Sequence, residues 1–388
     1  MARSVQEILA PEVIIEIVSR IALPGTTLSQ IFGWQVGAGP TRGLTTPLDD
    51  QPGNEPQGNF RDWPGRSGEY DIFDHTRRIA GARVPGTASS RIAPQKVGKV
   101  QFTLPRAAEI VELSDEDIHN RRPIGGPTSQ LDRGGVRYIE AQTRYIAERF
   151  ANLIEFQTAA MIRGTYTFDQ VGDELRHRFT GGETEISYQI PSGNKNRLDM
   201  LGGGAILSAS WATAGTDIPA NLFDINAAFV ELTGQGLAHM VVTSKQWNNI
   251  VNNTKVHTQG GSANIVFESI TRRSAGEFSA VLRSIPWLTI HVVDYGLEVW
   301  DGSSETFTKL IGDNYAAFFP EPDSSWCEYI RGGEYVTEGP NGVRDFRSGY
   351  YPYAWPLHDP SGWALANVFN GMPSLPVPKA MAYGEVEF

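Results

Sequence analysis

The sequence predicts an α+β protein organised around one unusually long helix, and three stretches of the chain support this prediction. Residues 135–163 carry apolar side chains at intervals of three and four, which is the spacing of one helix face. Residues 165–191 alternate polar and apolar side chains, as antiparallel strands do. Residues 216–319 mix short helical and strand patterns. We therefore expect a long helix, a β-rich region beside it and a separate α/β region.

The N-terminal part of the chain combines a helical pattern with a segment that is poorly suited to form a core. Residues 5–21 have the apolar spacing of an amphipathic helix. Residues 24–68 contain six prolines and nine glycines, too many for a segment that builds its own core. Large apolar side chains in such an arm need a covering surface, which a neighbouring subunit would supply. The candidate residues for this contact are Ile31, Phe32, Trp34, Phe60 and Trp63.

A basic stretch follows in residues 75–113, where the basic side chains flank a turn region rich in Gly, Pro and Ser. This pattern indicates a long two-stranded excursion from the body of the protein. One interpretation is an arm that docks on an acidic neighbouring subunit. The other is an ordinary solvated hairpin, since runs of charge are often merely exposed. The candidate contact residues are Arg77, Arg78, Arg83, Arg91, Lys96 and Lys99.

The helix predicted at residues 135–163 is far longer than the mean of about 11 to 12 residues. It would span about 43 Å at about 1.5 Å per residue. Gly164 is expected to end it, because glycine readily adopts the left-handed conformation that closes many helices. A long helix with one apolar stripe is typical of a support along which a sheet or a partner lies.

The α/β region should contain alternating short elements. Residues 223–232 and 245–253 have helical patterns, and residues 239–243 read as a short buried strand. Residues 288–293 and 298–300 are predicted to form a strand pair. The C-terminal part is rich in Gly, Pro and aromatic residues, and its prolines restrict the backbone to extended or edge positions.

Composition excludes several classes of protein. A formal net charge of −11 argues against a main role in gripping nucleic-acid phosphates, although the acidic wall of a container remains compatible with packaged DNA. The sequence has no apolar run of about 18 residues, so we expect a soluble protein without a membrane span or signal peptide, made in a cytosol. The single cysteine, Cys327, excludes an internal disulfide and is expected to be a small core residue.

The sequence offers no catalytic, cofactor-binding or metal-binding signature. The glycines at 202–204 lack the Lys-Ser/Thr that follows a phosphate loop, and no two of the seven histidines lie four residues apart. No Gly-x-Ser-x-Gly elbow occurs. We therefore expect a protein that is not an enzyme. One enzymatic alternative stays open: a glycan-active protein whose two carboxylates are hidden among 44 acidic residues, with nine tryptophans suited to sugar stacking.

Three stretches carry a resemblance to a known family: RYIEAQTRYIAERFANLIEFQTAAMIRGTYTF, KLIGDNYAAFFPE and DPSGWALANVFNGMPSLPVPKAMAYGEV. Together with the order of parts along the chain, they resemble the major capsid proteins of tailed phages, especially the lambda capsid protein E family. The chain departs from the simplest members in its Gly/Pro-rich stretch before the basic loop and in an insert at residues 332–355.

The resemblance implies the Hong Kong 97-type capsid fold, which encapsulins share. It consists of a β-rich peripheral domain built on a long spine helix, an α/β axial domain at the capsomer centre, an N-terminal arm and an extended loop. The implied boundaries are 1–54 for the arm, 55–112 for the extended loop region, 113–210 for the peripheral domain with its spine helix at 135–163, 211–340 for the axial domain and 341–388 for the return strands.

The function that the resemblance implies is self-assembly, as hexamers and pentamers, into an icosahedral head shell. The shell would enclose double-stranded DNA without sequence-specific binding and would form in the host bacterial cytoplasm as part of the virion. The implied partners are a separate scaffolding protein, a portal and a decoration protein. An encapsulin-like compartment shell is the nearer alternative, and the glycan-active protein is the more distant one.

Overall fold

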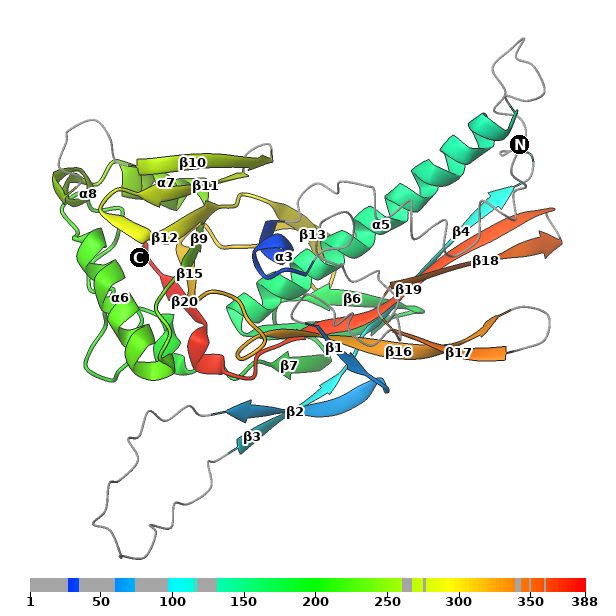
Figure 1. The fold of residues 1–388 in the computed structure, drawn as a ribbon, viewed down its shortest axis with the longest axis horizontal. Helices are drawn as coiled ribbons and strands as arrows, with labels where there is room; N and C mark the ends of the chain where they lie inside the picture. Colours follow the sequence, from blue (N-terminus) through cyan, green and yellow to red (C-terminus); the bar gives the residue numbers. More distant parts are fainter. Residues whose placement is uncertain are drawn as a thin grey trace, which may run out of the picture.

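The computed structural model describes residues 27–34, 60–73, 97–114, 116, 131–259, 267–274, 277–338, 343–348, 350–358 and 361–388. Two hydrophobic cores organise these residues. One core lies around a long helix, α5, and the sheets beside it, and the other lies inside an α/β unit. Figure 1 shows α5 running diagonally from the α/β unit to the far corner of the molecule.

Helix α5 (Leu131–Arg163) confirms the predicted long helix and begins four residues before the predicted start. Its buried face includes Ile139, Ile146 and Phe150, at the spacing that the sequence pattern gave. The helix ends where predicted, because Gly164 takes a φ of 91° and donates its N–H to the carbonyl of Ala160 at 2.9 Å.

A six-stranded sheet lies along α5. Its longest strand, β19, pairs antiparallel with β18 on one side and β4 on the other, and β16 pairs with its C-terminal end. Phe150 of α5 meets Phe369 of β19 edge-on at 6.1 Å, so the helix packs across this strand. The strands are β1 (Phe60–Trp63), β4 (Arg106–Ser114), β16 (Glu328–Glu338), β17 (Val343–Ser348), β18 (Tyr350–His358) and β19 (Ser361–Ser374).

Smaller sheets surround this core. The alternating pattern after α5 forms the antiparallel sheet β6-β5-β7, as predicted. Within the described residues there are also two two-stranded ribbons, β2–β3 and β13–β14. The strands are β2 (Ser67–Phe73), β3 (Val97–Thr103), β5 (Thr165–Val171), β6 (Glu174–Arg178), β7 (Thr184–Ser187), β13 (Gly296–Trp300) and β14 (Glu305–Lys309).

The α/β unit is a seven-stranded sheet in the order β10-β11-β12-β9-β15-β20-β8. The C-terminal strand β20 pairs with β15, so the chain ends inside this unit. The strands are β8 (Lys195–Asn196), β9 (His239–Val242), β10 (Phe267–Ser274), β11 (Glu277–Leu282), β12 (Ile285–Val292), β15 (Tyr315–Phe319) and β20 (Ala382–Glu385).

In the part of the chain that the structure describes, this sheet is accompanied by α6 (Ile218–Thr233), α7 (Ser244–Val251) and α8 (Thr254–Gln259). Asp217 caps α6 by accepting the N–H of Ala220 at 3.0 Å, and Gly234 ends the helix with a φ of 83°. The two predicted helices and the strand between them are therefore present. The described residues also include two short 3-10 turns, Ser192–Asn194 and Pro378–Ala380.

The predicted strand pair of residues 288–293 and 298–300 is wrong. Both strands exist, but β12 pairs with β11 and β9, whereas β13 pairs with β14. Periodicity identifies a strand without identifying its partner, because pairing depends on residues that are distant in sequence.

Residues 24–68 were predicted not to build a core of their own, and the part that the structure describes contributes to a core formed mainly by the rest of the chain. Residues Thr27–Ile31 form a short helix, α3, and Phe32 and Trp34 after it are buried. Figure 1 places α3 between α5 and the α/β unit. The predicted helix at residues 5–21 lies outside the described residues.

Candidate assembly surfaces

The β2–β3 ribbon is the base of the predicted excursion. Its strands pair antiparallel from Ser67↔Thr103 to Phe73↔Val97, so the chain leaves the body and returns to it. Figure 1 shows the ribbon projecting away from the sheets. Tyr70 and Phe102 are buried in the core, and Phe73 donates its backbone N–H to the Pro376 carbonyl at 2.8 Å. The ribbon therefore emerges from a fixed base.

The basic candidates on this excursion divide into two groups. Lys99 lies on β3 and is exposed, and its ammonium pairs with Glu69 on β2, which raises the pKa of Lys99. Lys99 therefore has a partner within its own ribbon. The other five candidates, Arg77, Arg78, Arg83, Arg91 and Lys96, lie outside the described residues.

The aromatic candidates of the arm pack mainly against their own chain. Phe32 stacks on Phe319 and Trp34, with ring centroids 4.9 Å apart in both pairs, and both candidates are at most 1% exposed. The prediction that a neighbouring subunit covers Phe32 and Trp34 is therefore wrong. Their own core covers them because α3 docks between the two halves of the molecule.

The remaining arm candidates, Ile31, Phe60 and Trp63, are half-buried. Strand β1 is held in place by its parallel pairing with β16 and by Arg331, whose guanidinium donates to both oxygens of Asp62 at 2.9 and 3.0 Å. The Arg331 guanidinium also lies over the Phe60 ring at 5.2 Å. These side chains therefore keep some surface for a neighbour, but their positions are fixed by this chain.

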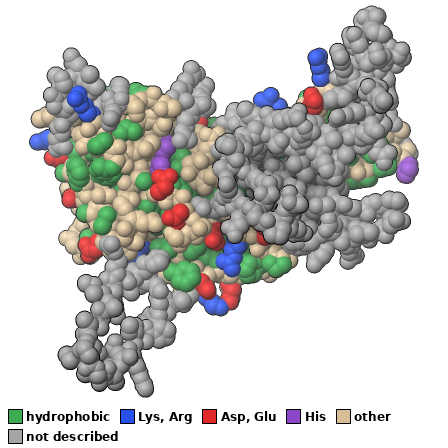
Figure 2. Space-filling model, viewed as in Figure 1, with side chains coloured by type: hydrophobic (Ala, Val, Ile, Leu, Met, Phe, Trp, Pro, Cys, Tyr) green, Lys and Arg blue, Asp and Glu red, His purple; other side chains and the backbone are tan. Residues whose placement is uncertain are grey.

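Helix α6 carries an exposed apolar stripe that the sequence analysis missed. Phe223 is 46% exposed and lies 5.9 Å from the ring of Trp287, which is 36% exposed. Val230, two turns after Phe223, is also exposed. Figure 2 shows hydrophobic side chains exposed over this unit. The sequence feature that could have predicted this stripe is that α6 has apolar residues on two faces, whereas only one face of a helix can pack on its sheet. We call Ala220, Phe223, Ala227, Val230 and Trp287 the α6 stripe.

A second exposed patch lies where α5 passes β4. Tyr145 and Ile110 are more than half exposed. Arg149 pairs with Glu109 of β4 at 2.7 Å and lies over the Tyr145 ring at 5.9 Å. Burial raises the pKa of the Glu109 carboxyl, against the opposing effect of Arg149. This patch combines apolar and charged groups at the edge of the sheet.

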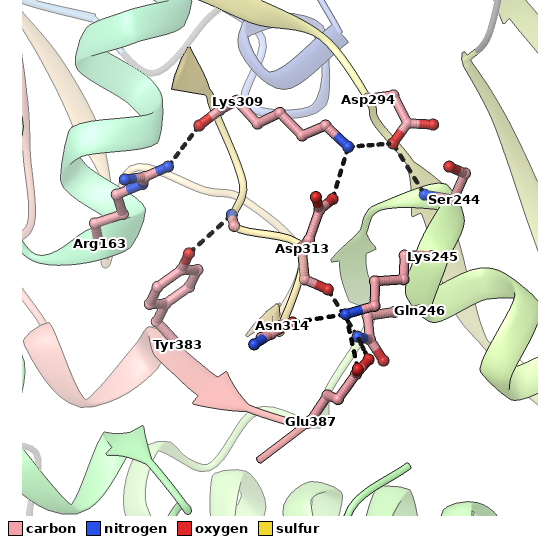
Figure 3. Close-up of polar contacts among 11 residues, drawn as sticks. Arg163, Ser244, Lys245, Gln246, Asp294, Lys309, Asp313, Asn314, Tyr383 and Glu387 are labelled. Atoms are coloured by element: carbon pink, nitrogen blue, oxygen red, sulfur yellow. Dashed lines mark hydrogen bonds and ion pairs between the residues drawn. The ribbon is translucent and has the colours of Figure 1, made fainter. Parts of the chain in front are cut away.

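A polar network joins the end of α5 to the α/β unit (Figure 3). Arg163, the last residue of α5, donates to the carbonyls of Lys309 and Leu310 at 2.6 and 3.0 Å. Lys309 in turn binds Asp313 at 2.7 Å, which raises the pKa of Lys309. Gly312 donates its N–H to the Tyr383 hydroxyl at 3.1 Å. The spine helix is therefore connected to the α/β unit by directed hydrogen bonds.

The same network continues to the C-terminal strand. Lys245 pairs with Glu387 at 2.7 Å, and Gln246 donates to the Glu387 carboxylate at 2.7 Å. Burial raises the pKa of Glu387, but these donors outweigh it and the net shift is downward. The C-terminal end is thereby fixed to α7.

The fold brings together one histidine pair that spacing alone did not suggest. His239 Nδ1 and His291 Nε2 lie 3.0 Å apart, and Glu321 lies 2.8 Å from His239 Nε2. His239 also lies against the Phe319 ring. Among the residues that the structure describes, no group of three or more His, Cys, Asp or Glu side chains could hold a metal ion. Cys327 is buried, as expected for a small core residue, and its thiol donates to the Asp323 carbonyl at 3.5 Å.

Within the described part of the chain, no helix combines the length and apolarity that a membrane crossing needs.

A family model described as phage major capsid protein E matches residues 64–386. The chain belongs to this family. It is therefore a shell-forming major capsid protein, and the family is one of structural capsid proteins. The predicted resemblance is confirmed. No curated protein matches the sequence.

Two solved structures are similar to this chain, and the first of them agrees with the family at the level of the fold. A prophage protein from Escherichia coli CFT073, assigned as a capsid protein, is 14% identical with a TM-score of 0.50, over 75% of this chain and 80% of that chain. A phage-related protein from Bordetella bronchiseptica RB50 is 11% identical with a TM-score of 0.48, and the match covers 97% of this chain and 96% of that chain. The major capsid protein has the α+β Hong Kong 97-type fold, as predicted.

Proposed function

We propose that this major capsid protein assembles with copies of itself, as hexamers and pentamers, into an icosahedral head shell that encloses double-stranded DNA. The observation that carries this proposal is the family match, which spans the ribbon, the spine helix, the sheets and the α/β unit. The net charge of −11 fits a wall that encloses DNA without gripping specific sequences. In this role the protein works by assembly and has no catalytic activity.

The two hydrophobic cores support the proposed division into domains. We propose residues 113–210, with α5, as a peripheral domain and residues 211–340 as an axial domain, with two elements crossing this boundary: β8 joins the seven-stranded sheet and β16 joins the six-stranded sheet. The return strands at 341–388 serve both, because β19 lies in the six-stranded sheet and β20 in the seven-stranded sheet. Residues 1–54 and 55–112 are the proposed arm and extended loop.

Two surfaces are proposed to contact neighbouring subunits. The first is the extended loop, where Arg77, Arg78, Arg83, Arg91 and Lys96 would meet an acidic patch of a neighbour. The second is the α6 stripe, because a shell protein must bury its exposed apolar surface between copies. We further propose a separate scaffolding protein, a portal and a decoration protein as partners, and assembly in the host bacterial cytoplasm.

Electron microscopy with light scattering, on the purified protein at several concentrations, tests this proposal. Closed shells, or discrete pentamers and hexamers, are the expected products. A protein that stays monomeric at every concentration, with and without a co-expressed scaffold, would contradict the proposal. Shells that package a protein cargo instead of DNA would point to a compartment shell.

A further inference from the structure

Residues 27–34 dock on a buried carboxylate in the C-terminal third of the spine helix. Glu155 of α5 is 1% exposed. It accepts the backbone N–H groups of Leu28 and Ser29 at 3.1 and 2.9 Å and the Ser29 hydroxyl at 2.6 Å. Those two amides lie in the first turn of α3, where a helix offers N–H groups without internal partners. Glu155 therefore caps a helix from a distant part of the chain.

A second buried carboxylate holds the same turn from the other side. Glu277 of β11 is 4% exposed and accepts the Thr27 hydroxyl hydrogen. Glu155 belongs to the spine helix and Glu277 to the seven-stranded sheet. The first turn of α3 is therefore bound to both halves of the molecule.

The aromatic residues after α3 repeat this arrangement. Phe32 packs on Phe319, the last residue of β15 in the α/β unit. Trp34 meets Tyr329 of β16, in the six-stranded sheet, edge-on at 5.4 Å. Both ends of residues 27–34 therefore bridge the two halves of the molecule, and we call this segment the clasp.

The surroundings of the Glu155 side chain couple docking of the clasp to protonation of its carboxyl group. The hydrogen-bond donors of Glu155 are all uncharged, and Glu277 is a second acidic group nearby. Burial, together with Glu277 and against the donors of Leu28 and Ser29, raises the pKa of Glu155 to about 8. Tyr295, after β12, faces the same region, and burial and the charges of Glu155, Glu277 and Glu148 raise its pKa. A carboxyl group in such surroundings favours its neutral form.

We propose that the clasp is a proton-linked lock between the spine helix and the α/β unit. Docking of residues 27–34 buries Glu155 in its protonated form, and loss of that proton releases the segment. An undocked clasp would leave Glu155 in water with a pKa near its ordinary value of about 4.3. Because docking raises this pKa, the protonated carboxyl stabilises the docked state fully at a pH below about 4.3. That stabilisation is lost as the pH rises through about 8. This proposal concerns the subunit and stands whether or not shells form.

Hydrogen–deuterium exchange on the purified full-length protein tests the lock. The amides of Leu28 and Ser29 should lose at least about tenfold of their protection between pH 6 and pH 9, after correction for intrinsic exchange. Glu155→Gln should keep the protection and lose its pH dependence, because an amide cannot ionise. Glu140→Gln, an exposed position on the same helix, is the matched control and should behave as the unmodified protein.

Protection that stays constant from pH 6 to pH 9 in the unmodified protein would overturn the proposal, as would an unchanged pH dependence in Glu155→Gln. Ser29→Ala provides a second test should Glu155→Gln fail to fold. It removes a donor that favours the ionised carboxylate, so the pKa of Glu155 in the docked state, read from the ¹³C shift of its carboxyl group, should move upward. A docked-state pKa that stays constant or moves downward would contradict the lock.

Discussion

The clasp and the α6 stripe have opposite relations to the subunit that carries them. The clasp comes from a Gly/Pro-rich stretch, yet its aromatic side chains are buried in the subunit's own core. The α6 stripe lies on a regular helix with a packed inner face, yet it leaves Phe223 46% exposed. The regularity of a segment therefore does not decide whether its apolar groups are available to a partner. Where the segment docks decides it.

The largest effect should come from the clasp. Trp34→Ala removes a fully buried indole and should lower the free energy of unfolding by about 3 to 5 kcal/mol. Trp287→Ala, in the α6 stripe, should lower it by less than about 1 kcal/mol, because that indole is already 36% exposed. Urea denaturation of the free subunit measures both values. Equal losses for the two tryptophans would break the comparison.

A smaller loss should follow disruption of the ion pair that holds β1. Arg331→Ala leaves Asp62 without its bidentate partner and should cost about 2 kcal/mol. That is below the cost of breaking a fully buried pair, because the Asp62 side chain is 23% exposed. Calorimetry checks the value, with Arg144→Ala, part of an exposed pair on α5, as the control that should change little. A loss no larger than that of the control would mean that β1 is not fixed by this pair.

The α6 stripe should matter for assembly and not for folding. Phe223→Ser should leave the free energy of unfolding within about 0.5 kcal/mol of the unmodified value. If burial of the Phe223 ring between subunits contributes about 1.5 kcal/mol to the free energy of association, its loss would raise the critical concentration for assembly about tenfold. Light scattering measures that concentration. Asp224→Ser, the exposed neighbour on the same helix, is the control. Assembly of Phe223→Ser at the unmodified critical concentration would show that the α6 stripe is not a contact between subunits.

The smallest effect is expected at Lys99. Because its ammonium is exposed and pairs within its own ribbon, Lys99→Ala should leave both unfolding and assembly without measurable change. A marked assembly defect, seen by light scattering under the same conditions, would show that Lys99 also serves a neighbouring subunit.

Local patterns in the sequence were sufficient for the main elements. The end of α5 at Gly164 and the strands β5 to β7 follow from periodicity and from one glycine. The partner of β12 did not follow, because β9 and β11 reach it through tertiary contacts. The α3 helix was equally hidden: five residues cannot form a stable helix alone, and Glu155, more than a hundred positions away, supplies its cap.

The candidate site was predicted less well than the fold. Composition indicated that the arm needs cover, but it could not indicate that Phe319 and Tyr329 of the same chain supply it. The α6 stripe was overlooked because the helical pattern of residues 223–232 does not tell which of its apolar residues face the sheet. Distinguishing one apolar face of a helix from two requires the orientation of that helix on its sheet.

The most direct test of this account compares hydrogen–deuterium exchange in free subunits and in assembled shells at one pH. We expect the peptide that covers α6 and the peptides between residues 74 and 96 to gain protection on assembly. The peptide that covers residues 27–34 should be protected already in the free subunit and should change little. Protection of residues 27–34 only in shells, with no change at α6, would contradict the account.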